Sequence, residues 1–462
     1  MKTRALVVSL AVCAAMLALF SPARALRVTA PKPNIILVVT DDQRWDTVWS
    51  METVKRELIA NGVKFTQAHT VVPLCCPSRA SILTGTYPHT HGVYGNQNSG
   101  GGFAGFDDRR PTIATVLHSA GYRTGLVGKY LNGYGKRDAG RPSTYIPPGW
   151  DDWHGLITGN AKDYYGYALS ENGSVKHYGS RPADYLTDVL TDRARDFVAA
   201  ASPKPFFLYW TPLAPHLSAV PSPAYEHAFD DLAPWRPSTY NEKAAEDKPL
   251  WVRDLPPFTK SASKRIDDFR ERQYETLQSV DDGLKAILRE LSPAELANTF
   301  VVFTSDNGYQ WGEHRLHSKN FAYEENTRVP LVIRWGRMSA GTVSNELATT
   351  IDLAPTFAAL AGTRMPGAEG LNLLPTLRVG APLRDEHLIE SAGKLSPPFC
   401  TLRTRAFTFT RLATGEEEYY GLEADPLEAR NVVADLQASR RKAIRDRLRA
   451  MCRPLPPGMP NF

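Results

Sequence analysis

The sequence predicts an α/β fold in which a large mixed, mostly parallel β-sheet lies between helices, followed by a small C-terminal α+β subdomain on an antiparallel sheet. Three observations support this prediction. Short apolar, β-branched segments recur along most of the chain and are typical of strands buried on both faces. Amphipathic helical patterns lie between these segments. After about Leu383 the pattern changes to closely spaced strands and one charged helix.

The first predicted strand covers residues 33–42 and ends in two carboxylates, Asp41 and Asp42. Because strands and helices alternate, we expect a doubly wound sheet whose ligands bind beyond the carboxyl ends of its strands. Asp306 and Asn307 follow another predicted strand and lie at such an end. The further strands are predicted at residues 123–127, 206–211, 300–305 and 330–334, and the helices at 112–120, 184–200 and 265–291.

Two segments, residues 136–179 and 218–260, are rich in Pro, Gly, Trp and Tyr and lack clean periodicity. We predict that both are long loops that pass over the sheet edge and shape the binding site. We place the main domain at residues 26–383 and the C-terminal subdomain at 384–462. The subdomain strands are predicted at residues 387–390, 401–412 and 418–422, and its amphipathic helix at 433–449.

Residues 1–25 predict an exported protein, because a basic start, an apolar run and a small-residue end are typical of a cleaved signal peptide. The apolar run is too short for a transmembrane anchor, so we expect no stable membrane insertion. Removing this segment takes away Lys2, Arg4 and Arg24 and no acid, which lowers the formal net charge from +5 to +2. This near balance gives no support for nucleic-acid binding.

The predicted location is the periplasm or the extracellular space. A single glycosylation sequon, at residues 172–174, makes a lysosomal enzyme the less favoured alternative. The mature chain keeps four cysteines, which is too few for a disulfide scaffold of this size. Cys400 and Cys452 are able to pair in an oxidising compartment, and the sequence leaves open whether they do.

The segment Leu74-Cys75-Cys76-Pro77-Ser78-Arg79 is the most informative stretch. One interpretation is structural: two adjacent cysteines that are buried or disulfide-bonded before a proline turn. The spacing also resembles the Cys-x-Pro-Ser-Arg signature of the formylglycine sulfatases. In that family the first cysteine, here Cys75, is oxidised to an aldehyde whose hydrate is the nucleophile.

Asp41, Asp42, Asp306 and Asn307 come from two distant strand ends and supply hard oxygen ligands of the kind that calcium prefers. Taken alone, each pair also fits a helix cap or a turn. Together with the cysteine motif they predict one calcium site beside the nucleophile.

From Asn34 to about Gly370 the chain resembles the sulfatase family, and within it the N-acetylglucosamine-6-sulfatases and related heparan-directed sulfatases most of all. The matching segments are residues 40–43, 74–85, 128–132, 150, 184–190, 214–216, 279–282, 305–308, 312–314 and 319. The resemblance implies an alkaline phosphatase-like fold and hydrolysis of sulfate monoesters, with glycosaminoglycan degradation as the setting. It also implies a 6-sulfated N-acetylglucosamine or related sulfated sugar as substrate, and a formylglycine-generating enzyme as a partner during maturation.

The resemblance further implies that formylglycine from Cys75 ligates the metal with Asp41, Asp42, Asp306 and Asn307. A geminal diol can expel sulfate by collapsing to the aldehyde, which a serine cannot do. Arg79 would pair with the hydrate oxygens and lower the pKa of the diol. The other catalytic or substrate-binding candidates are Lys129, Asn132, His216, His314 and Lys319.

The chain departs from many arylsulfatases at Leu131, where they carry a histidine that is a candidate acid for the leaving group. The proton donor therefore stays open among His216, Lys319 and His314. Two alternative functions also stay open: a phosphomonoester or phosphonate-ester hydrolase on the same fold, and an unmodified, non-catalytic protein that binds sulfated glycans.

Overall fold

The computed structural model describes residues 31–97, 101–136, 141–157, 164–200, 202–243 and 245–462, and the predicted signal peptide lies outside them. The chain divides into two units, residues 1–32 and 33–462, and the second contains every helix and strand described below. None of the helices in the described residues is long and apolar enough to cross a bilayer.

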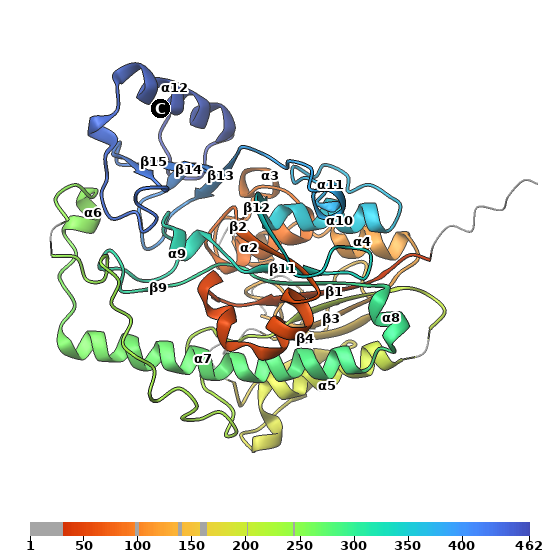
Figure 1. The fold of residues 1–462 in the computed structure, drawn as a ribbon. Coiled ribbons are helices and arrows are strands. Elements are labelled where there is room, and N and C mark those ends of the chain that lie inside the picture. The colour runs from red at the N-terminus through yellow and green to blue at the C-terminus, as the bar shows by residue number, and fades with distance from the viewer. Residues whose placement is uncertain (1–30, 98–100, 137–140, 158–163, 201, 244) are drawn as a thin grey trace, which may run out of the picture. The chain divides into compact units, whose positions relative to one another are not determined.

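The second unit is built on a ten-stranded mixed sheet (Figure 1). In spatial order its strands are β12 (Thr342–Thr349), β2 (Gly62–His69), β11 (Leu331–Arg334), β8 (Thr299–Ser305), β1 (Asn34–Thr40), β7 (Phe206–Thr211), β3 (Arg123–Gly128), β4 (Asp152–Leu156), β5 (Ala168–Glu171) and β6 (Ser174–His177). The central run from β8 to β4 is parallel, whereas β11 pairs antiparallel with both β8 and β2. The predicted mixed, mostly parallel sheet is confirmed.

Strand β1 is buried on both faces, as its unbroken apolar sequence predicts. Ile35 and Leu37 point into one core, which they share with α4 (Ile113–Ser119) and α10 (Leu353–Leu360). Ile36 and Val38 point into the opposite core, which they share with α5 (Leu186–Ala199) and α7 (Lys260–Arg289). Helices therefore cover both faces of the sheet.

The C-terminal part forms a separate antiparallel sheet, as predicted. Its strands are β13 (Glu386–Ser391), β14 (Phe399–Thr404), β15 (Phe407–Leu412) and β16 (Glu417–Gly421), and α12 (Ala438–Met451) packs on it through Ile444 and Leu448. A disulfide joins Cys400 on β14 to Cys452, just after α12, which answers the question that the sequence left open. The domain boundaries at residues 26, 383 and 384 stay predictions.

Two details of the sequence-based prediction are wrong, and two strands of the large sheet were missed. Residues 401–412 are not one strand but the hairpin β14–β15, which turns at Arg405 and Ala406. The predicted loop at 136–179 contributes three strands, β4 to β6, which widen the sheet. Strands β2 and β12 were not predicted.

The segment at 218–260 is mostly loop, as predicted, with one short helix, α6 (Leu250–Arg253). The remaining elements are short or 3-10 helical, apart from α2, which carries the cysteine motif. They are η1 (Trp45–Ser50), η2 (Val54–Ile59), α2 (Cys75–Thr84), α3 (Pro88–His91), η3 (Phe103–Gly105), η5 (Pro182–Asp184), α8 (Pro293–Ala297), β9 (Gln310–Trp311), β10 (His317–Ser318), α9 (Glu324–Thr327), η6 (Thr350–Asp352), α11 (Leu374–Val379) and η7 (Val433–Asp435).

Candidate active site

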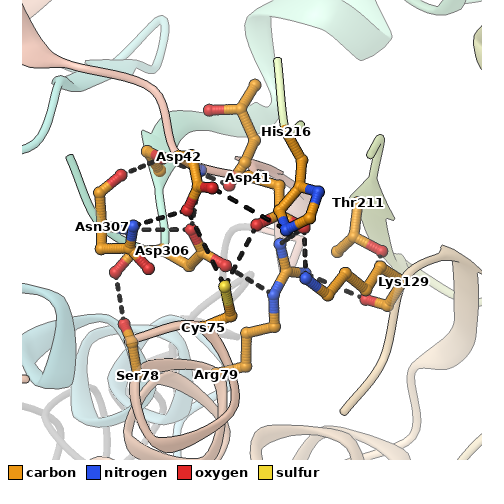
Figure 2. Close-up of polar contacts among 12 residues, drawn as sticks. Asp41, Asp42, Cys75, Ser78, Arg79, Lys129, Thr211, His216, Asp306 and Asn307 are labelled. Carbon is orange, nitrogen blue, oxygen red and sulfur yellow. Dashed lines mark hydrogen bonds and ion pairs between the residues drawn. The ribbon is translucent and has the colours of Figure 1, made fainter. Parts of the chain in front are cut away.

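The strand register brings the predicted carboxylates together at one edge of the sheet. Thr40 of β1 lies opposite Ser305 of β8, so the residues that follow each strand emerge side by side. The backbone N–H of Asp42 donates to Asp306 Oδ1 at 3.1 Å, and the side-chain amide of Asn307 donates to Asp42 Oδ1 at 2.7 Å (Figure 2). All four predicted oxygen ligands are buried at this edge.

Cys75 begins α2 and points at these carboxylates (Figure 2). Its Sγ lies 3.4 Å from Asp41 Oδ1 and 3.8 Å from Asp42 Oδ1. Ser78 fixes this end of the helix, because its hydroxyl donates to the backbone carbonyl of Asp306 at 2.5 Å. Burial, with the carboxylates nearby, raises the pKa of the Cys75 thiol well above its usual value.

Arg79 lies one helical turn beyond Cys75 and therefore on the same face of α2. Its side chain is fully buried. Nε donates to Asp306 Oδ2 at 2.8 Å, Nη1 donates to the carbonyl of Lys129 at 3.0 Å, and Nη2 lies 3.6 Å from Asp41. This one side chain thus connects both strand-end carboxylates to the loop that carries Lys129.

Lys129 follows β3 directly and forms an ion pair with Asp41. The close approach of β3 to Thr211 just before Lys129 requires a glycine at position 128. Gly128 has φ 119°, and a Cβ there would lie 2.1 Å from the carbonyl oxygen of Thr211. The Thr211 hydroxyl donates to the carbonyl of Lys129 at 2.8 Å. Burial alone would lower the pKa of the Lys129 ammonium, but Asp41 and Cys75 raise it above its usual value.

Lys319 contacts the same centre through Asp42 and Cys75, whereas Lys129 pairs with Asp41. Its Nζ donates to both oxygens of Asp42, at 2.5 and 2.6 Å, and to Cys75 Sγ at 2.7 Å. Burial opposes the charge, but Asp42 and Cys75 hold the pKa of this ammonium well above its usual value. Lys319 therefore stays protonated.

His216 is 19% exposed, and its Nε2 lies 3.8 Å from Asp42 Oδ2. Its Nδ1 lies 2.5 Å from the carbonyl oxygen of Leu217. Because a carbonyl only accepts, Nδ1 carries the proton and Nε2 faces the carboxylates as an acceptor. Burial lowers the pKa of this imidazole, which keeps it neutral.

The structure does not bring the remaining two predicted residues into this cluster. His314 is buried, lies 3.0 Å from Glu242 and stacks on Tyr323 at 4.3 Å, and no contact with Cys75 is found within the described part of the chain. Asn132 accepts a hydrogen bond from the N–H of Phe103 through its backbone carbonyl. Its side-chain oxygen is buried and has no hydrogen-bond partner among the described residues.

The residues present fit a hard divalent cation. Ligand atoms of Asp41, Asp42, Cys75 and Asp306 all lie within 4.8 Å of one another and are buried. Asn307 Oδ1 is buried beside them and no donor among the described residues reaches it, so an oxygen ligand is available. Burial and the neighbouring Asp41 raise the pKa of Asp306 to about 6, although Arg79 opposes the shift.

No role was predicted from the sequence for two contributors: Ser78, which belongs to the cysteine motif, and Thr211. Both act through hydrogen bonds to backbone carbonyls, which a sequence motif does not reveal. The position of Thr211 at the carboxyl end of a predicted strand is the one signal that pointed to it. Glu313, which belongs to the matching segment at 312–314, holds other side chains in place. It accepts a hydrogen bond from Arg44 at 2.6 Å and another from the indole of Trp235 at 2.5 Å.

Comparison with known proteins decides the family. Residues 33–363 match the family described as "Sulfatase", and residues 312–453 match "N-sulphoglucosamine sulphohydrolase, C-terminal". The chain belongs to the sulfatase family. The family predicted from the sequence, an enzyme family of sulfuric ester hydrolases, is therefore confirmed.

Three relatives show how far the likeness extends. Human N-acetylglucosamine-6-sulfatase is 35% identical over 80% of this chain and 69% of its own length. The extracellular sulfatase SULF-1 homolog of Drosophila melanogaster is 36% identical over 79% of this chain, which spans only 33% of that protein. A solved structure of a protein in complex with its substrate D-glucosamine-2-N,6-O-disulfate has a TM-score of 0.78 and 25% identity, covering 91% of this chain and 97% of that one.

Proposed function

We propose that this chain hydrolyses sulfate monoesters, with formylglycine formed from Cys75 as the nucleophile and one bound calcium ion. The observation that carries the proposal is the convergence of Cys75, Asp41, Asp42 and Asp306 in one buried cluster with Arg79. We further propose that the substrate is a 6-sulfated N-acetylglucosamine or a related sulfated glycan. The names of the human relative and of the substrate in the solved complex support this substrate class.

Asp41, Asp42, Asp306 and Asn307 would hold the calcium ion. The calcium ion would supply a polarising positive charge, and the formylglycine hydrate would supply the hydroxyl that attacks sulfur. Arg79 is placed to stabilise negative charge at position 75, because it lies one turn away and is fixed by Asp306. Lys129 and Lys319 are placed to bind sulfate oxygens, since both keep their protons. Lys319 contacts Cys75 directly, and Lys129 pairs with Asp41, which lies next to Cys75.

The neutral His216 presents Nε2 as an acceptor, which suits a base that takes a proton from the hydrate when sulfate is expelled. Lys319 is then the better candidate to donate a hydrogen bond to the leaving oxygen, because its Nζ already reaches Cys75 Sγ. His314 is the weakest candidate, because its contacts lie with Glu242 and Tyr323. Asn132 stays a candidate for binding the sugar.

The charge balance of the centre favours sulfate over phosphate monoesters. Three carboxylates face three cations: Arg79 and Lys129 pair with Asp41 and Asp306, and Lys319 pairs with Asp42. A calcium ion therefore leaves two positive charges. An ionised nucleophile and a monoanionic sulfate ester neutralise both charges, whereas a dianionic phosphate ester would leave a buried negative charge.

The remaining assignments are proposals as well. We propose that residues 1–25 direct export to the periplasm or extracellular space, and that a formylglycine-generating enzyme oxidises Cys75. Residues 26–383 would form the catalytic domain and residues 384–462 a C-terminal subdomain. Degradation of glycosaminoglycans is the setting that fits these assignments.

A substitution at the nucleophile tests the proposal. Cys75→Ala should abolish hydrolysis of aryl sulfates and of 6-sulfated sugars while the far-ultraviolet circular dichroism stays unchanged. Mass analysis of the Cys75 peptide from the active protein should show the aldehyde. Full activity of Cys75→Ala would refute the mechanism, and faster turnover of phosphonate esters than of sulfate esters in parallel assays would favour the alternative hydrolase. An unmodified thiol in a protein that binds sulfated glycans without hydrolysing them would favour the non-catalytic alternative.

A further inference from the structure

A concave site lies on the sheet outside the candidate active site. It is a cavity of about 420 Å³ bounded by η1, η2, β2 and β11, and we refer to it as the η1–η2 cavity. Its lining includes none of the candidate active-site residues. Its floor is apolar, because Val48 and Val332 line it and belong to the hydrophobic core on this face of the sheet.

The cavity begins at the edge of the sheet that carries the catalytic carboxylates. Leu331 of β11 lies opposite Thr304 of β8, two residues before Asp306. In the sheet order β11 is two strands away from β1, which corresponds to about 10 Å. The η1–η2 cavity is thus close to the centre without being part of it.

Two tryptophans form rigid aromatic walls. Trp49 is 51% exposed, and its ring is held in place by Tyr274, at 5.3 Å between ring centroids and 3.3 Å between the indole nitrogen and the phenol oxygen. Trp45 carries the Arg328 guanidinium over its ring at 4.9 Å. A large indole that stays half exposed beside a cavity provides apolar contact area for a bound ring.

The polar groups of the cavity are mainly cationic. Lys64 lies opposite Val332 across β2 and β11, so its side chain points to the same face as Val332, toward the cavity. No carboxylate among the described residues forms an ion pair with Lys64. The one acidic lining residue, Asp46, accepts from Arg44 at 3.0 and 2.8 Å, but Arg44 also pairs with Glu313. Lys55, Lys64 and Arg328 still outnumber Asp46 in the lining.

Two further cations, Lys55 and Arg328, line the cavity and are only partly available to pair with a ligand, because each already lies near a carboxylate. Lys55 pairs with Glu52 at 2.7 Å, and the Arg328 guanidinium lies 3.8 Å from the nearest carboxylate oxygen, on Glu324. Both add to the positive potential without supplying an unpaired charge. Lys64 is therefore the cation that an incoming acidic group meets.

We propose that the η1–η2 cavity binds a small organic anion with an aromatic body, whose ring lies against Trp49 and whose acidic group pairs with Lys64. The volume is in the range of small-molecule sites, which combine an apolar lining with a few placed polar groups. The apolar floor favours an aromatic body over a simple sugar, because buried sugar hydroxyls lose water and need hydrogen-bond partners there. This site does not depend on the proposed sulfatase activity.

Naphthalene-2-sulfonate is a suitable probe, because its sulfur is bonded to carbon and a sulfate-ester hydrolase cannot cleave it. Binding is measured by calorimetry and by quenching of tryptophan fluorescence in the full chain. Lys64→Ala should weaken binding by up to about fivefold, since one exposed ion pair is lost. Trp49→Ala should weaken it by roughly tenfold, since the ring contact is lost.

The matched control is Lys319→Ala, which alters the catalytic centre and should leave the affinity for naphthalene-2-sulfonate unchanged. Lys64 lines the cavity and is not a candidate active-site residue, so Lys64→Ala should leave hydrolysis of a small sulfate ester unchanged. Equal affinity in wild type, Lys64→Ala and Trp49→Ala would overturn the proposal. Binding that is lost in Lys319→Ala but kept in the two cavity variants would place the anion in the catalytic centre and would overturn it as well.

Discussion

Arg79→Ala gives the sharpest test of how the centre is held together. The substitution removes the 2.8 Å pair with Asp306, the longer pair with Asp41 and the hydrogen bond to the carbonyl of Lys129, all in a fully buried place. Loss of one partner from a buried pair leaves an uncompensated charge and costs about 3–5 kcal/mol. We expect the free energy of unfolding without calcium to fall by that amount, measured by urea denaturation. In Arg79→Lys the free energy of unfolding should fall less, because lysine keeps the charge but lacks the forked geometry of the guanidinium.

Calcium should distinguish this local effect from general destabilisation. In wild type, calcium at a hundred times its dissociation constant should stabilise the fold by about 2.7 kcal/mol. At the same calcium concentration, the stabilisation by calcium should be larger in Arg79→Ala, because the cation then compensates carboxylates that have lost their arginine. Arg403→Ala is the matched control, since it removes a buried arginine paired with Glu324 at 2.8 Å and should respond to calcium as wild type does. Unchanged unfolding of Arg79→Ala, or an equal calcium gain in all three proteins, would refute the reasoning.

Three further predictions follow from single contacts. Asn307→Ala should weaken calcium binding by roughly tenfold or more in calorimetry, because the available buried oxygen is removed; unchanged affinity would exclude Asn307 as a ligand. Cys452→Ser should cost about 4 kcal/mol in urea denaturation, as expected for a cross-link that spans 52 residues, and an equal loss in reduced wild type is the check. Burial opposes protonation of His89, but hydrogen bonds to two glutamates outweigh it and raise its pKa to about 9, above the ordinary value of about 6.5. Its charged form therefore stabilises the fold at pH 6 and loses this contribution as the pH rises through 9, so the stability gap between wild type and His89→Gln should shrink between pH 6 and pH 10; a constant gap would contradict this.

The centre could be predicted from sequence because its main signals are local. The carboxylates at 41 and 42 follow an unmistakable buried strand, and Cys75 and Arg79 lie one turn apart on a single helix. That these segments meet follows from parallel strands ending at a common edge. His314 shows the limit of motif reasoning: it belongs to a matching segment, yet its side chain contacts Glu242 and Tyr323 instead.

The parts of the fold that were missed lack local signals. The hairpin between β14 and β15 turns at Arg405 and Ala406, without the Gly, Asn or Pro that usually mark a turn. Strand β6 is exposed along its whole length, so no apolar pattern distinguishes it from a loop. The antiparallel position of β11 between β2 and β8 depends on pairing between segments that are far apart in the sequence.

The geometry of Asp42 shows how the fold holds one of the proposed cation ligands in place. Asp42 has φ 68°, a left-handed conformation that costs roughly 1–2 kcal/mol for a residue other than glycine. Its own N–H donates to Asp306 Oδ1 at 3.1 Å, and the next N–H, from Gln43, donates to the Ser305 hydroxyl at 3.0 Å. These two bonds tie the chain after β1 to the carboxyl end of β8, so the strained residue is held by two strands that the core already fixes. The carboxylate therefore points at Cys75 without reorganisation, and the folding energy of the sheet maintains the strain.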